Sequence, residues 1–61
     1  MFNIDDRVVI HSTGSDLDGV TGVIKGVLKR FLVDDFIIFL DKKVKGYDPA
    51  IVLIESCIKL V

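Results

Sequence analysis

The stretch DLDGVTGVIKGV, residues 16–27, constrains the fold more than any other part of the chain. It sets glycines at positions 19, 22 and 26 among valines, an isoleucine and a threonine. Each glycine inside a helix costs roughly 1 kcal/mol relative to alanine, and the β-branched residues crowd a helix further. Glycine within a strand often marks a bulge, a tight bend or a close approach of two backbones. We therefore interpret this stretch as a strongly coiled strand.

A helical alternative competes for the same residues. Apolar side chains from Val20 to Leu32 also follow the spacing of a helical stripe. In an extended chain, however, one face is wholly apolar or glycine, because it carries Val20, Gly22, Ile24, Gly26 and Leu28. The glycines favour the strand, and a helical turn near residues 29–33 stays open as an alternative.

Four further segments are short and rich in β-forming residues: RVVIH, DDFIIFLD, IVLIE and SCIKLV. Loops rich in glycine and polar residues separate them, at residues 12–19 and 42–50. Five short strands without a long helix predict an all-β fold. We expect a small closed barrel, since closure shelters the sheet edges. The residues expected inside are Val8, Ile10, Ile24, Leu28 and Ile38.

The length and composition predict a single domain, residues 1–61, with more apolar residues than a small barrel can enclose. Hydrophobic residues make up 51% of the chain, so some should stay outside unless another molecule covers them. The N-terminal residues do not resemble a secretory signal. No apolar run approaches the roughly 20 residues that span a bilayer. Cys57 is the single cysteine, and we expect a cytoplasmic protein with a reduced thiol.

Residues suited to catalysis are few. His11 is the single histidine, and together with Cys57 it supplies the residue types of a nucleophile–base pair. We favour the interpretation that Cys57 packs as a small hydrophobe and that His11 faces water. The paired aspartates at 5–6 and 34–35 point apart in strands, and no P-loop pattern follows the glycines. The sequence therefore predicts no enzyme, no cofactor and no metal site.

Two segments resemble the KOW motif. Its acidic-x-Val-x-aliphatic strand is matched by Asp6, Val8 and Ile10, and its Gly-x-x-Gly-x-aliphatic part is matched by Gly19, Gly22 and Ile24. KOW segments sit in small barrels of the Src-homology-3 type, found in ribosomal proteins and transcription elongation factors. The C-terminal ESCIKLV is similar to the turn and last strand of such barrels. The resemblance implies a five-stranded Src-homology-3-like barrel that binds RNA or a transcription complex.

The chain departs from that pattern in the loop at residues 12–19, which carries aspartates and no lysine or arginine. KOW loops that bind nucleic acid tend to be basic. The formal net charge of −1 likewise gives no general attraction to phosphate. Our first hypothesis is therefore a non-enzymatic binding module that self-associates or docks on a larger protein. We expect a regulatory accessory protein of the kind that phages encode.

The surplus apolar residues define the interface of this first hypothesis. Four lie on strand faces opposite the expected core, and one lies in the connection that follows residue 30. The predicted interface residues are Val23, Val27, Phe31, Ile37 and Phe39.

The alternative hypothesis is KOW-like binding of RNA, DNA or a transcription complex through basic residues, with aromatic stacking. We expect hairpin pairing to bring the loop at 42–45 near Lys29 and Arg30. The candidate nucleic-acid-binding residues are Lys25, Lys29, Arg30, Lys42, Lys43, Lys45 and Tyr47.

Overall fold

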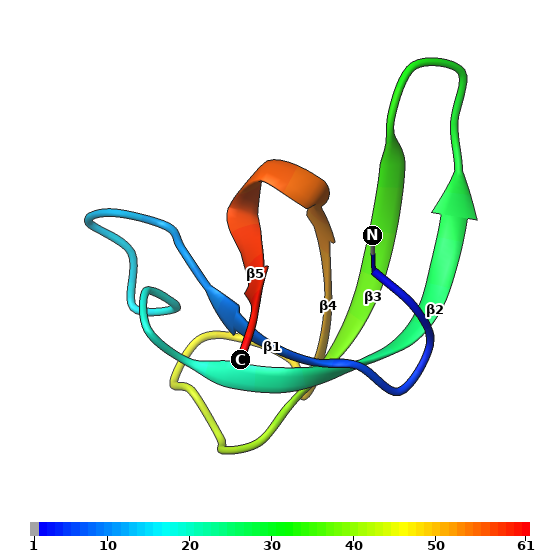
Figure 1. The fold of residues 1–61 in the computed structure, drawn as a ribbon. Helices are drawn as coiled ribbons and strands as arrows, with labels where there is room; N and C mark the ends of the chain where they lie inside the picture. Colours follow the sequence, from blue (N-terminus) through cyan, green and yellow to red (C-terminus); the bar gives the residue numbers. More distant parts are fainter. Residues whose placement is uncertain (1) are drawn as a thin grey trace.

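The computed structural model describes residues 2–61, which form a five-stranded antiparallel sheet (Figure 1). The sheet has the order β4-β3-β2-β1-β5. Its elements are β1 (Arg7–Ile10), β2 (Thr21–Lys29), β3 (Asp34–Leu40), β4 (Ala50–Ile54), the 3-10 turn η1 (Glu55–Cys57) and β5 (Ile58–Leu60). The all-β prediction is confirmed, and the helical alternative is wrong because residues 21–29 are a strand. Residues 2–61 include no helix long and apolar enough to cross a bilayer.

The predicted barrel is not closed by hydrogen bonds. β4 pairs with β3, and β5 pairs with β1, but no ladder within residues 2–61 joins β4 to β5. The three-residue turn η1 carries the chain away from β4, so that β5 lies along β1. The sheet curls instead, since β2 bends from its pairing with β1 into the tall hairpin with β3 (Figure 1).

The core lies inside this curl and is wholly apolar. Four of the five residues expected there are fully buried, namely Val8, Ile10, Ile24 and Ile38. Phe2 packs edge-on against Phe36, with ring centroids 5.5 Å apart, so the N-terminal segment covers part of the core. Five further residues from strands and loops complete the buried cluster: Leu17, Val20, Phe36, Val44 and Ile58.

The fifth expected core residue, Leu28, is instead 47% exposed, because β2 contains a β-bulge. Ile24 and Gly26 pair with consecutive residues of β3, which leaves Lys25 without a partner in the ladder. One extra residue reverses the alternation of inward and outward side chains beyond it. The predicted alternation therefore holds before Lys25 and is wrong after it.

Val27 and Leu28 consequently occupy the reverse of their predicted positions. Val27 lies opposite the buried Phe36 and packs against the core. Leu28 lies opposite Asp35 on the outer face of the sheet. The bulge thus moves one apolar residue inward and another outward.

The glycines in and just before β2 meet different structural needs. A Cβ at Gly22 would lie 2.7 Å from Cγ2 of Ile38 and 2.7 Å from the carbonyl oxygen of Phe39, so only glycine allows this approach to β3. Gly26 adjoins the bulge. Gly19 has a φ of +83°, which other residues rarely adopt, and it turns the chain into β2.

Candidate protein-binding surface

The outer face of β2, β3 and β4 is mostly apolar, with Asp35 as its acidic residue between Leu28 and Ile54. The cross-strand register sets Val23 beside Phe39, and it sets Ile37 beside Val52. Phe39 is 49% exposed and Val52 is 52% exposed. We define the outer apolar face as Val23, Leu28, Ile37, Phe39, Val52 and Ile54.

Strand β3 shows why this face exists. Its inward residues Phe36 and Ile38 are buried. The residues that alternate with them, Ile37 and Phe39, point outward. A strand that is apolar on both faces is usually covered on both. Within residues 2–61 only one face of β3 is covered, and uncovered apolar patches commonly mark interaction sites.

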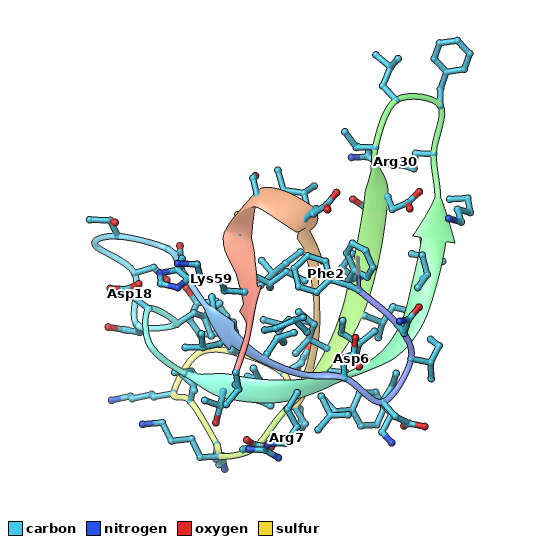
Figure 2. All side chains as sticks on the ribbon, viewed as in Figure 1. Phe2, Asp6, Arg7, Asp18, Arg30 and Lys59 are labelled. Atoms are coloured by element: carbon cyan, nitrogen blue, oxygen red, sulfur yellow. The ribbon has the colours of Figure 1, made fainter. Side chains whose placement is uncertain are left out.

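The β2–β3 hairpin extends beyond the body of the sheet and ends in an apolar tip (Figures 1 and 2). Phe31 is 98% exposed and Leu32 is 85% exposed at this tip. Below it, Lys29 Nζ lies 3.0 Å from Asp34 Oδ2. Arg30, labelled in Figure 2, places its Nε 3.0 Å from Oδ2 of Asp35. These two ion pairs join the strands and leave the stem of the hairpin without formal net charge.

A groove of about 580 Å³ lies between the hairpin tip and the turn η1. Its walls are residues 30–34 on one side and Ile54, Glu55 and Ser56 on the other. Ile54 also belongs to the outer apolar face, so the groove connects that face to the tip.

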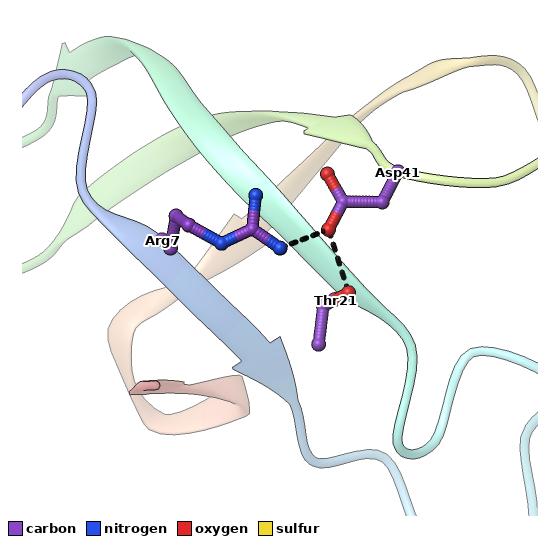
Figure 3. Close-up of polar contacts among 3 residues, drawn as sticks. All are labelled: Arg7, Thr21 and Asp41. Atoms are coloured by element: carbon purple, nitrogen blue, oxygen red, sulfur yellow. Dashed lines mark hydrogen bonds and ion pairs between the residues drawn. The ribbon is translucent and has the colours of Figure 1, made fainter.

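A polar cluster borders the opposite end of the outer apolar face (Figure 3). Arg7 Nη2 donates to Oδ2 of Asp41 at 2.6 Å, and the Thr21 hydroxyl donates to the same oxygen at 2.6 Å. The hydrogen bond from Thr21, and then the contacts with Arg7, hold the pKa of Asp41 below its ordinary value, against an opposing effect of desolvation. Arg7 pairs with Val23 across β1 and β2. The outer apolar face therefore has a polar border at this end, and protein interfaces usually have a polar rim.

The predicted interface residues separate into two groups. Val23, Ile37 and Phe39 lie on the outer apolar face, and Phe31 lies at the hairpin tip. Val27 is the exception, since the bulge turns it toward the core. An interface role for these residues stays a prediction.

Sequence reasoning missed Leu28, Val52 and Ile54 as members of the outer apolar face. Alternation along IVLIE could have found Val52 and Ile54, because they lie on the opposite side from Ile51 and Leu53. Gly26 signals a candidate bulge in the sequence, but it does not fix which residue is left unpaired, so alternation alone could not predict that Leu28 turns outward.

The candidate nucleic-acid-binding residues do not come together. β2 and β3 are antiparallel, so Lys29 and Arg30 lie at the hairpin end, while the loop at 41–49 lies at the other end of β3 (Figure 1). The expectation that this loop approaches Lys29 and Arg30 is therefore wrong. Lys25 is also engaged, with its Nζ 2.9 Å from Oδ1 of Asp5.

The remaining basic residues share the loop between β3 and β4. Across residues 2–61, no carboxylate lies within ion-pair distance of Lys42, Lys43 or Lys45. Tyr47 is 42% exposed and, with Val44, helps to line a pocket of about 350 Å³. This loop is the part of the surface best suited to phosphate.

His11 and Cys57 are neighbours through their backbones. The His11 N–H donates to the Cys57 carbonyl oxygen at 2.8 Å. Their side chains form no hydrogen bond with each other in the described part of the chain, where His11 is exposed and Cys57 is half-buried. Residues 2–61 also contain no cluster of three His, Cys, Asp or Glu side chains that could hold a metal ion.

Four of the six residues that resemble the KOW motif lie on the neighbouring strands β1 and β2, and Asp6 and Gly19 lie just before these strands. Val8 and Ile10 of β1 meet Ile24 of β2 in the core, and Gly22 lies directly opposite Val8. Their spacing thus serves the packing of β1 against β2. No family model matches the chain, and comparisons with curated proteins and with solved structures find no match.

Proposed function

We propose that the chain is a non-enzymatic protein-binding module that docks on a larger protein through the outer apolar face and the hairpin tip. The observation that supports this proposal is the continuity of the apolar surface. It runs from Phe39 to Ile54, and the groove beside η1, whose walls are partly apolar and partly charged, connects it to Phe31. Covering one such side chain contributes roughly 1.5–3 kcal/mol. Several together can offset the rigid-body cost of association, about 4–15 kcal/mol.

The charges around this surface favour a protein over nucleic acid or an anionic membrane. The basic residues of the hairpin stem are already paired with Asp34 and Asp35. The chain carries a formal net charge of −1. Nucleic acids and anionic membranes bind basic side chains that neutralise their phosphates and release counterions. Both basic side chains of the hairpin stem are already paired with aspartates.

We further propose that the curled sheet is a Src-homology-3-like barrel that stays open between β4 and β5. The five antiparallel strands support this assignment. The tight turn η1 occurs where ESCIKLV resembles the corresponding turn of those barrels. In this proposal the barrel acts as a rigid base that presents the hairpin.

Phe31→Ser and Phe39→Ser each test the docking surface. We expect each variant to weaken partner binding at least tenfold, because truncating an aromatic anchor at an interface costs about 2 kcal/mol or more. The partner is captured from a lysate of the native source with the wild type, purified, and titrated with each variant by calorimetry.

Leu60→Ser is the matched control. Leu60 is 52% exposed, much like Phe39, but it lies on β5, outside the proposed docking surface. We expect this control to bind as the wild type does, with all three variants retaining their β-sheet circular dichroism. If both phenylalanine variants bind as tightly as Leu60→Ser does, the proposal is wrong.

The loop between β3 and β4 supports a second candidate, the binding of RNA or DNA, since its lysines are free of carboxylate partners. On our first proposal we expect no shift with RNA or DNA at low salt. Binding that falls steeply with salt, and that falls again when Lys42, Lys43 and Lys45 become alanine, would favour the second candidate. Lys25→Ala is the control in this gel-shift measurement, because Lys25 is paired with Asp5.

A further inference from the structure

Strand β4 is a sheet edge without the usual protection. Natural edge strands carry charges, prolines or bulges, or they are covered by another element. The five residues Ala50–Ile54 include no charge and no proline, and they form a regular ladder with β3. The other edge, β5, is three residues long and carries Lys59. β4 is therefore the edge on which another strand can add.

The β3–β4 ladder determines which backbone groups of β4 are free. The Leu40 N–H donates to the Pro49 carbonyl oxygen at 2.9 Å, and these two residues lie directly opposite each other. Along an antiparallel strand, residues bonded to the neighbour alternate with residues whose N–H and C=O groups point away. Ala50, Val52 and Ile54 therefore direct these groups toward the free edge.

Both faces of β4 are also incompletely covered. Ile51 and Leu53 point inward but remain half-buried, although they lie opposite the buried Ile38 and Phe36. On the outer side, Val52 is more exposed still. A strand added at the free edge would cover side chains on both faces of β4.

We propose that β4 pairs antiparallel with β4 of a second copy of this chain, about a two-fold axis through Val52. Val52 then opposes the partner's Val52, and Ala50 opposes the partner's Ile54. Every free N–H and C=O group of the edge gains a partner in this register. Inward residues also meet inward residues, since Ile51 opposes the partner's Leu53. The two outer apolar faces become one.

Charge favours a second copy as the occupant. β4 contains no charged residue, so self-pairing brings no like charges together along the strand. The flanking acids do not lie directly opposite each other, because Asp48 would oppose the partner's Ser56 and Glu55 would oppose the partner's Pro49. This pairing uses the backbone edge of β4, whereas docking on the larger protein is anchored by Phe31 and Phe39. Val52 and Ile54 belong to both surfaces, so the two contacts are separated by variants at the anchors.

Single cysteines in a Cys57→Ser background test the register. With Val52→Cys, the two Cα atoms lie about 5.5 Å apart across the axis, within the range for a disulfide. With Ile54→Cys, the two positions are roughly 14 Å apart along the strands. We expect mild oxidation to link Val52→Cys into dimers at least tenfold more than Ile54→Cys. Equal linking, or no linking, would overturn the proposed register.

A backbone substitution tests the hydrogen bonds themselves. Val52→Pro removes an N–H that points to the free edge and leaves the β3–β4 bonds intact, while Val52→Thr keeps the N–H and the shape. We expect Val52→Pro to raise the dimer dissociation constant at least tenfold, and Val52→Thr to change it less than threefold, by sedimentation equilibrium. Phe39→Ser, which weakens docking on the larger protein in our proposed function, is expected to leave this constant unchanged.

Amide hydrogen exchange on the wild type requires no variant. We expect the amides of Ala50, Val52 and Ile54 to gain protection as protein concentration rises, and those of Ile51 and Leu53 to stay constant. A mass that remains monomeric at every concentration refutes the pairing. Growth beyond dimers would indicate head-to-tail addition of β4 to β5 instead, because such contacts do not close on a two-fold axis.

Discussion

Gly22→Val is expected to destabilise the domain strongly. The added Cβ would lie 2.7 Å from the carbonyl oxygen of Phe39, which is backbone and can move only if β3 moves. Overpacking of this kind typically costs about 1–3 kcal/mol, and forced displacement of a strand costs more. Small domains sit near the lower end of the usual stability of about 5–15 kcal/mol. We expect urea unfolding, followed by circular dichroism, to show a loss of at least about 3 kcal/mol.

Gly26→Ala is the control for this experiment. A Cβ at Gly26 would meet Cδ1 of Ile37 at 2.9 Å, which is the free end of a flexible side chain. Rotation of that side chain relieves the contact, so we expect a loss of about 1 kcal/mol or less. A Gly22→Val protein as stable as Gly26→Ala would show that β2 and β3 can separate without cost.

The second large effect is expected at Ile38, which is fully buried between β2 and β4. Ile38→Ala removes core volume that the surrounding strands cannot fill, so we expect it to cost about 2–5 kcal/mol. Ile37→Ala makes the same chemical change on the outer apolar face and should cost about 1 kcal/mol. Shifts in the urea denaturation midpoint, for variants whose m-value equals that of the wild type, would establish both free-energy losses. Equal losses would contradict the assignment of inner and outer faces.

Much of the fold follows from local patterns in the sequence. The strands are short, β-branched and bounded by polar or glycine-rich loops, and alternation alone identifies Val8, Ile10, Ile24 and Ile38 as core. The bulge at Lys25 depends on how β2 pairs with β3. Pairing is a tertiary property, so alternation read along one strand could not predict that Val27 turns inward and Leu28 outward.

The candidate surface was predictable to a similar extent. Apolar residues on both sides of DDFIIFLD indicate an outer face at Ile37 and Phe39, and the structure exposes Phe39. The separation of Lys29 from the loop at 42–45 follows from antiparallel geometry, because opposite ends of β3 cannot meet. Closure was harder to predict, since it depends on the direction in which η1 sends the last strand.

The pairing of β5 with β1 also sets the order in which this protein can fold. β1 to β4 form a meander in which each strand pairs with the next along the chain, and such local contacts form rapidly. The contact between Val8 and Leu60 instead encloses nearly the whole chain in one loop, whose closure entropy must be overcome in a single step. Because its contacts are local, the meander can assemble before β5 docks on β1. The core around Val8 and Ile10 is completed only when β5 pairs with β1, so the free edge of β1 stays open to other chains until that step.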